Sequence, residues 1–168
     1  MSSVSRTVRG MARSGPELAL LLLGSYRKLV DAAVLELAAR GYHDVRPVHD
    51  FAMRAIAAGA DSASELGRRL SVSKQAAAKT IAVLLERGYI AREEDPTDRR
   101  RKRIEVTPLG FDVMRTGEAI FDELREHWSH QLGEAELEAL EAQLRAFVGN
   151  APVRSEAPGW VALELDGR

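Results

Sequence analysis

Apolar residues recur every three or four positions over most of the chain, which is the spacing of helices with one buried face. The first such stretch begins near Ser14, where Ser14 and Glu17 have the spacing of a capping box around Pro16. The pattern predicts a helix of about 24 residues. Further apolar side chains spread over much of its circumference, so we expect part of this helix to contact a second chain. The recurring positions are Leu18, Leu22, Tyr26, Leu29, Ala33 and Leu37.

The middle of the chain has the pattern of a helix-turn-helix. Residues 48–58 resemble a helix that is ended by a glycine. Ser62 and Glu65 form a second capping box at the start of a short helix, and Ser73 caps another helix after a brief turn. The apolar stripe of that last helix consists of Ala77, Ile81, Leu84 and Leu85.

The hydrophobic period changes to two after Gly88, which predicts a pair of strands. Tyr89 and Ile90 begin the first strand, and Ile104 and Val106 belong to the second. The loop between them contains five consecutive basic residues at positions 99–103. We therefore expect a hairpin with a charged tip.

Two more helices complete the predicted fold. Thr107 and Pro108 supply a cap and a first-turn proline for a long helix over residues 109–131, and Gly133 precedes a final amphipathic helix. The pattern thus predicts a mainly α fold with a small β-hairpin, in which a helix-turn-helix lies between long N- and C-terminal helices. The expected division is a flexible arm (1–13), an N-terminal helix and turn (14–47), the helix-turn-helix with its hairpin (48–107), C-terminal helices (108–149) and a tail (150–168).

Composition limits the possible chemistry. The chain has 168 residues, enough for one core, and it contains no cysteine. This excludes zinc fingers, iron–sulfur sites, thiol catalysis and cysteine redox sensing. No run approaches the roughly 20 apolar residues of a membrane span, so we expect a cytoplasmic protein that makes no contact with a membrane.

Charge is balanced in total but unevenly distributed. The formal net charge is −1. Residues 61–107 hold 11 basic and 8 acidic side chains, whereas residues 108–168 hold 5 and 12. The local field decides whether a surface attracts a polyanion, so the basic middle of the chain is the expected side of contact.

The second helix of a helix-turn-helix enters the major groove of DNA with short polar and basic side chains at its start. The corresponding side chains here are Ser73, Lys74, Gln75 and Lys79, and Thr80 could reach a phosphate. An amphipathic helix with a merely solvated polar face would show the same pattern, so this alternative stays open.

The predicted hairpin tip strengthens the nucleic-acid interpretation. Consecutive like charges repel one another, so their density indicates an anionic partner, and a narrow minor groove attracts arginine. We expect Asp98 to hold Arg99 or Arg100 in one rotamer. A solvated charged turn is the alternative.

Two strings of residues resemble the multiple antibiotic resistance regulator (MarR) family of dimeric winged-helix transcription factors. One runs from Leu70 through Gln75 to Ile90, and the other from Asp95 to Gly110. The resemblance implies that Ser73, Lys74, Gln75 and Lys79 lie on a recognition helix. It also implies that Asp98 and Arg100 form the wing motif with Arg99 and Arg101 nearby. The fold class is then mainly α with a small β-hairpin wing, a winged helix-turn-helix (48–107) between long N-terminal (14–47) and C-terminal (108–149) dimerisation helices.

A dimer of this kind would bind a palindromic operator in double-stranded DNA, with half-site centres roughly 34 Å apart. Family members often release DNA when a small aromatic or phenolic anion binds between the dimer helices and the winged helix, which makes the chain a candidate ligand-responsive repressor. Tyr26, His43, Arg46 and His49 are the candidate lining of such a pocket. Alternatively, Tyr26 packs in the core and both histidines make local hydrogen bonds.

Three other functions compete with this prediction: a metal-responsive regulator, a metal-dependent hydrolase and a winged-helix module that binds protein. His127 and His130, near Glu123 and Glu126, have helical spacing, and each of the other two histidines precedes an aspartate. However, the spacing is not that of a zincin, and no glycine-rich phosphate loop follows a strand. We therefore predict no enzymatic activity, no metal site and no cofactor.

Overall fold

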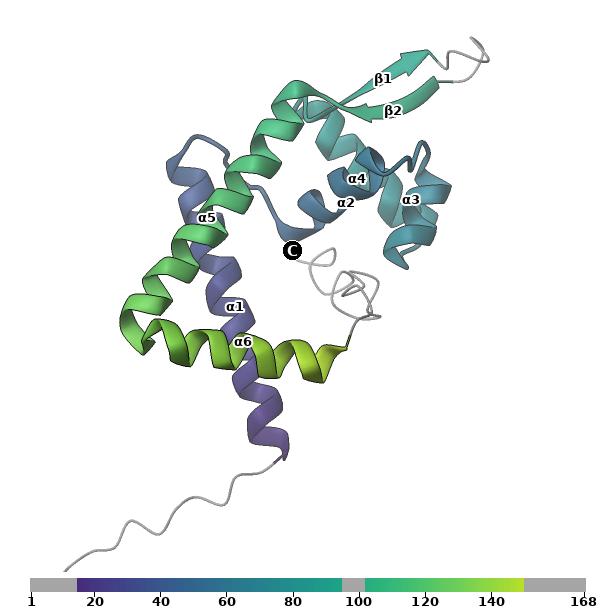
Figure 1. Cartoon of the computed structure of the whole chain (residues 1–168). Helices are drawn as coiled ribbons and strands as arrows, with labels where there is room; N and C mark the ends of the chain where they lie inside the picture. The colour runs from purple at the N-terminus through teal and green to yellow at the C-terminus, as the bar shows by residue number, and fades with distance from the viewer. Residues whose placement is uncertain (1–14, 95–101, 150–168) are drawn as a thin grey trace, which may run out of the picture.

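The computed structural model describes residues 15–94 and 102–149 of the chain. Those residues form six helices and one two-stranded antiparallel sheet, in the predicted order (Figure 1). The elements are α1 (Gly15–Ala39), α2 (Pro47–Ala57), α3 (Ala63–Leu70), α4 (Lys74–Glu86), β1 (Ile90–Glu94), β2 (Lys102–Val106), α5 (Pro108–Leu132) and α6 (Glu134–Val148). The predicted fold class is therefore confirmed, with helix boundaries displaced by a residue or two.

The core lies where α2, α3 and α4 pack against one another and against the base of the hairpin. Met53, Leu66, Leu84 and Ile90 are almost completely buried there. Full burial of such side chains stabilises a fold by about 1.5–3 kcal/mol each. The same cluster continues along α1 and α5, so the two long helices are joined to the winged unit by apolar contacts.

Side-chain caps fix the two helices of the helix-turn-helix. The hydroxyl of Ser62 accepts a hydrogen bond from the backbone N–H of Glu65, and that of Ser73 accepts from Ala76. Between the helices, Ser71 has a left-handed backbone with φ 52°. A side chain on Gly67 would meet the carbonyl oxygen of Val72 at 2.9 Å, so a glycine is required for the tight turn.

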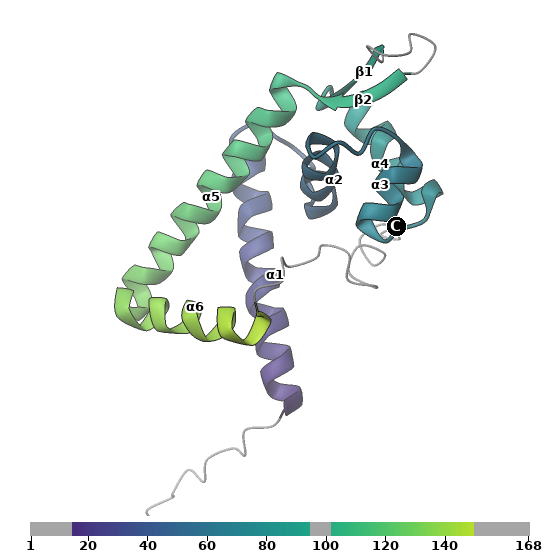
Figure 2. The ribbon, with the colours of Figure 1, turned by 45° about the vertical axis from the view of Figure 1, so that its right-hand side comes forward.

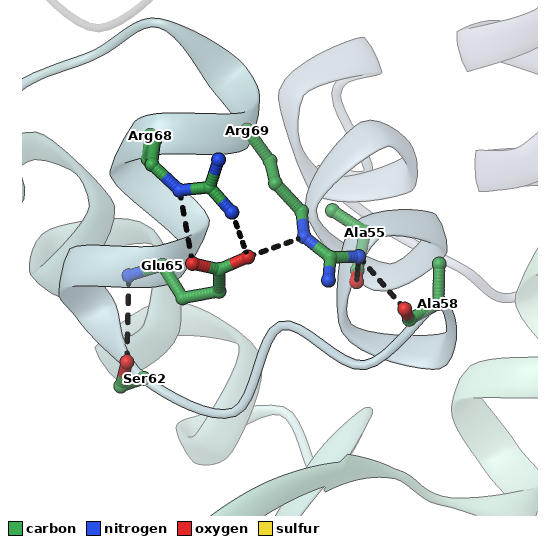
Figure 3. A network of polar contacts seen from close by, with 6 residues as sticks. All are labelled: Ala55, Ala58, Ser62, Glu65, Arg68 and Arg69. Carbon is green, nitrogen blue, oxygen red and sulfur yellow. Dashed lines mark hydrogen bonds and ion pairs between the residues drawn. The ribbon is translucent and has the colours of Figure 1, made fainter.

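One half of the predicted capping box at α3 is wrong. The carboxylate of Glu65 pairs with Arg68 (2.7 Å) and Arg69 (2.8 Å) instead of turning back to the cap (Figure 3). Arg69 also donates to the carbonyl oxygens of Ala55 (3.3 Å) and Ala58 (2.7 Å) at the end of α2. The charged network thus ties α3 to α2 and positions the helix-turn-helix.

The hairpin and α5 are joined at a crowded corner. The hydroxyl of Thr107 donates to the carbonyl of Gly88 (2.6 Å) and accepts from the N–H of Gly110 (3.1 Å), so Thr107 is the cap of α5 that the sequence predicts. A Cβ on Gly110 would lie 2.1 Å from the carbonyl oxygen of Tyr89. Close backbone contact therefore sets the direction in which the hairpin leaves the core.

The long helices form a separate arm. α5 runs away from the hairpin and packs on α1, and α6 turns back at the remote end of α5 (Figures 1 and 2). Arg125 holds this second corner through Glu134 (3.0 Å) and Glu141 (2.7 Å). No helix among the described residues is long and apolar enough to cross a membrane.

Candidate nucleic-acid interface and effector cavity

One face of α4 is exposed and carries most of the predicted recognition residues. Lys74, Gln75 and Lys79 are exposed, the small side chains of Ala78 and Ala82 lie between and beyond them, and the exposed Glu86 ends the helix. Within the described residues neither lysine forms an ion pair with a carboxylate. This face therefore combines two cations and an amide on a narrow helix surface that has the dimensions to enter a major groove.

The opposite face of α4 is fixed in the core. Ala77, Ile81 and Leu84 are buried as predicted, and Leu85 is half-buried. Ser73 is exposed, and its hydroxyl oxygen is engaged as the helix cap. The helix can thus present its polar face without moving its apolar one.

Thr80 is buried, unlike the other predicted recognition residues. The side chain is 4% exposed, and its hydroxyl donates to the carbonyl oxygen of Ala76 at 3.3 Å. A residue at this position faces inward because it lies three residues after the buried Ala77. The hydroxyl is thus engaged within α4, and the contact of Thr80 with a phosphate stays a prediction from the sequence.

The hairpin lies beside α4, and its strands pair from Ile90 opposite Val106 to Glu94 opposite Lys102. Arg92 on β1 is exposed, and Arg103 on β2 pairs with Glu105. The predicted wing residues Asp98, Arg99, Arg100 and Arg101 lie outside the described residues. Their contacts remain predictions from the sequence.

A cavity of about 240 Å³ lies between the long helices and the winged unit. Its wall is almost entirely apolar, with aromatic side chains from each of the three helices that surround it. Tyr26 comes from α1, Phe51 from α2 and Phe121 from α5. A small aromatic molecule would fit this chemistry.

Three charged side chains belong to the lining of this cavity. Arg46, Asp50 and Arg54 all contribute to its lining. Arg54 pairs with Asp50 on its own helix (2.7 Å) and with Glu118 on α5 (2.9 Å), and these hydrogen bonds raise its pKa above the ordinary arginine value. The Arg54 pairs link α2 to α5 directly beside the cavity.

Two of the four predicted pocket residues line the cavity, and two do not. Tyr26 and Arg46 contribute to its wall, whereas His43 is exposed and His49 faces a different depression. His49 is 6% exposed, and its Nδ1 accepts from the N–H of Arg46 at 3.2 Å. Its local role at the start of α2 is thus the alternative given from the sequence.

The environment of His49 keeps its ring uncharged. Burial, together with the neighbouring cations Arg87 and Arg46, lowers the pKa of the imidazole to about 4. Arg87 lies 3.5 Å from Nδ1 and donates to the carbonyl of Asp44 at 2.7 Å. The spacing pattern gave no signal for Arg87, because its partners lie more than thirty residues earlier in the chain.

The histidines show no arrangement for a metal. Among the described residues, no cluster of three or more metal-ligating side chains occurs. On α5, His127 lies 3.0 Å from the amide nitrogen of Gln131.

Comparisons with known proteins agree with this architecture. Residues 44–101 match the sequence model of the MarR family. No curated protein matches the chain by sequence.

Solved structures extend the likeness beyond the matched segment. The reduced form of MarR from E. coli has a TM-score of 0.64 and 18% identity, covering 83% of this chain and 100% of that one. FabT from Streptococcus pneumoniae, solved in complex with DNA, has a TM-score of 0.63 and 17% identity over 80% and 95% of the two chains. MepR from S. aureus, bound to ethidium bromide, has a TM-score of 0.55 and 19% identity over 81% and 95%.

The family match covers the turn before α2, the helix-turn-helix and the first strand, and the fold likeness extends over the long helices. MarR-family proteins are regulators rather than enzymes. Residues 44–101 thus carry the sequence signature of the MarR family of winged-helix transcriptional regulators, and the described chain has the fold of the reduced MarR structure.

Proposed function

We propose that this regulator binds a palindromic operator as a homodimer and releases it when a small aromatic ligand enters the cavity. The observation that carries the DNA-binding half is the exposed face of α4. Lys74, Gln75 and Lys79 project from a helix whose other side is buried and whose start is capped. Gln is suited to adenine, and Lys to guanine or phosphate.

The wing is the second proposed contact. Arg99, Arg100 and Arg101 follow β1 in the sequence, and β1 lies next to α4. A hairpin tip beside a recognition helix reaches the minor groove adjacent to the major groove that the helix occupies. FabT has a similar fold and was solved with DNA, which supports DNA as the partner of this chain.

A second copy of the chain is the proposed partner of the long helices. Large apolar side chains of α1 and α6 are exposed in the single chain, Phe147 at 80% and Leu35 at 71%. Exposed large apolar side chains in this number mark an interaction site. Two copies related by a two-fold axis would present both α4 helices to one duplex. The other exposed positions on these helices are Leu18, Leu20, Leu21, Leu22, Leu140, Leu144 and Val148.

Base recognition by α4 is tested with Gln75→Ala, using Gln143→Ala on α6 as the control of equal size. Affinity is measured by fluorescence anisotropy on a duplex selected by the wild-type protein and on a random duplex. We expect Gln75→Ala to weaken binding of the selected duplex by about 1–3 kcal/mol and binding of the random duplex much less. Equal losses on both duplexes would contradict base recognition, and equal affinity of the wild type for both would favour a module that binds protein.

The cavity supports the ligand-responsive half of the proposal. It lies between α5 and the winged unit, so a molecule inside it would alter the position of α2, and with it α4, relative to the long helices. MepR was solved with ethidium bromide, a planar aromatic compound, which is consistent with an aromatic ligand for a protein of this fold. Release of DNA by the ligand would make the protein a repressor wherever its operator overlaps a promoter.

The ligand proposal is tested by titrating benzoate, phenol and benzylamine against the preformed DNA complex. An aromatic anion or phenol should dissociate the complex, and Val34→Trp, which fills the cavity from α1, should abolish the response while leaving DNA affinity intact. Unchanged dissociation in Val34→Trp would place the ligand elsewhere, and a response to benzylamine alone would reverse the expected ligand charge.

A further inference from the structure

We propose that a second depression, on the flank of α4, is a site for one phosphate group of the DNA backbone. This inference rests on the proposed function, because it assigns a phosphodiester partner to residues beside the recognition face. Its three cations are Arg46, Lys79 and Arg87. Two of them, Arg46 and Arg87, have no place among the predicted DNA contacts.

The depression has a volume of about 380 Å³ and lies between the start of α2 and the outer edge of α4. Arg46 and His49 form its α2 side, and Lys79, Val83 and Arg87 its α4 side. Cations from two separate elements therefore converge on one open hollow. A tetrahedral anion needs several donors around it, and an arrangement of this kind supplies them.

The charge of the hollow is strongly asymmetric. Three cations line it, and Asp44 is the single acidic residue of the lining. The Asp44 carboxylate is 81% exposed and lies 4.0 Å from Arg87, so solvent weakens that pair. The depression beside the hairpin is lined by Asp61, Glu105 and one arginine, which gives it the opposite sign.

Arg87 is held in place without being neutralised by a buried carboxylate. Its Nη1 donates to the backbone carbonyl of Asp44 at 2.7 Å. Asp44 has a left-handed backbone with φ 57°, a conformation that costs energy for a residue other than glycine. This turn presents the carbonyl to Arg87, and the guanidinium keeps its positive charge for an outside partner.

The position of the hollow selects a DNA phosphate. Lys79 belongs to the exposed face of α4 and also lines the hollow, so the two surfaces are continuous. When a helix occupies a major groove, the phosphates that border the groove lie beside the helix. A phosphate on the DNA strand that borders this flank of α4 would then contact Lys79, Arg87 and Arg46 together. Lys79 accordingly contacts backbone rather than a base.

The test compares Lys79→Gln, Arg87→Gln and Arg87→Lys with Arg145→Gln, an equal loss of charge on α6, which lies well away from α4 in Figures 1 and 2. Dissociation constants are measured on the selected and the random duplex from low to high salt. Each Gln variant should weaken binding of both duplexes by the same factor and reduce the slope of log K against log salt by about 1. Arg87→Lys should retain the wild-type slope, which separates charge from folding, and Arg145→Gln should change nothing.

Calorimetric titration with inorganic phosphate, with and without Arg87→Gln, distinguishes a DNA phosphate from a free one. If the wild type binds DNA and both Gln variants keep its slope of log K against log salt, the inference is overturned and the proposed function stands. Loss of specificity in Lys79→Gln, without a change of slope, would also overturn it. If the wild type binds no DNA, the proposed function fails. In that case phosphate binding that Arg87→Gln abolishes would show that the site serves a free anion, and absence of phosphate binding would overturn the site itself.

Discussion

His49 gives the protein a defined loss of stability in mild acid. The folded state keeps its imidazole neutral with a pKa of about 4, whereas an unfolded histidine titrates near 6.5. Between these two values the unfolded chain binds the additional proton, so the free energy of unfolding falls as the pH decreases from 6.5 toward 4. Above pH 6.5 both states are neutral and the effect vanishes.

The size of the effect follows from the two pKa values. Linkage over this difference gives about 1.8 kcal/mol between pH 7 and pH 5. Part of the ring surroundings remains open to water, and the screening reduces the expected loss to about 1 kcal/mol. His49→Gln removes the titration and keeps an acceptor in a position to receive the N–H of Arg46, so α2 retains its cap.

The assay is urea unfolding of the wild type and His49→Gln at pH 7 and pH 5, at one fixed protein concentration because a dimer unfolds in a concentration-dependent way. The wild type should lose about 1 kcal/mol more than the variant on acidification. His43→Gln, which changes the exposed histidine of the same turn, is the control and should behave as the wild type. An equal pH dependence in His49→Gln and the wild type would refute the argument that His49 is held neutral.

Three further predictions concern the scaffold. Gly110→Ala should lower the free energy of unfolding by at least about 2 kcal/mol in urea titrations, because its Cβ would lie 2.1 Å from the Tyr89 carbonyl oxygen; a smaller loss would show that the corner can relax. Arg69→Ala should cost about 1–2 kcal/mol more than Arg68→Ala in the same assay, since Arg69 donates to two carbonyl oxygens at the end of α2; equal costs would contradict the linking role. Leu35→Glu should convert a dimer to a monomer in sedimentation equilibrium without unfolding the winged unit, whereas an unchanged mass would exclude this part of α1 from the interface.

Local signals in the sequence were sufficient for most of the fold. Ser62, Ser73 and Thr107 are caps in the structure as predicted, because a hydroxyl beside the first turn of a helix has few better partners. The change from helical to alternating spacing located the hairpin, since its inward positions Ile90 and Ile104 are buried. These features depend on contacts within a few residues or across one turn.

Features that depend on contacts between distant elements were predicted less well. The carboxylate of Glu65 pairs with Arg68 and Arg69, and this preference over the cap is decided by where α2 lies. His49 lies on the same side of α2 as the buried apolar residues of that helix, so its spacing could have placed it in the interior. The cavity needs α1, α2 and α5 in register, so Phe51 and Phe121 could not be recognised as its lining from spacing alone.

The proposed function requires two copies of the chain to present their α4 helices to one duplex. Selection of bound duplexes from a random pool at physiological salt tests this arrangement. We expect an inverted repeat whose half-site centres are one helical turn, about 34 Å, apart. Recovery of a single unrepeated site, or of no preferred sequence at all, would contradict it.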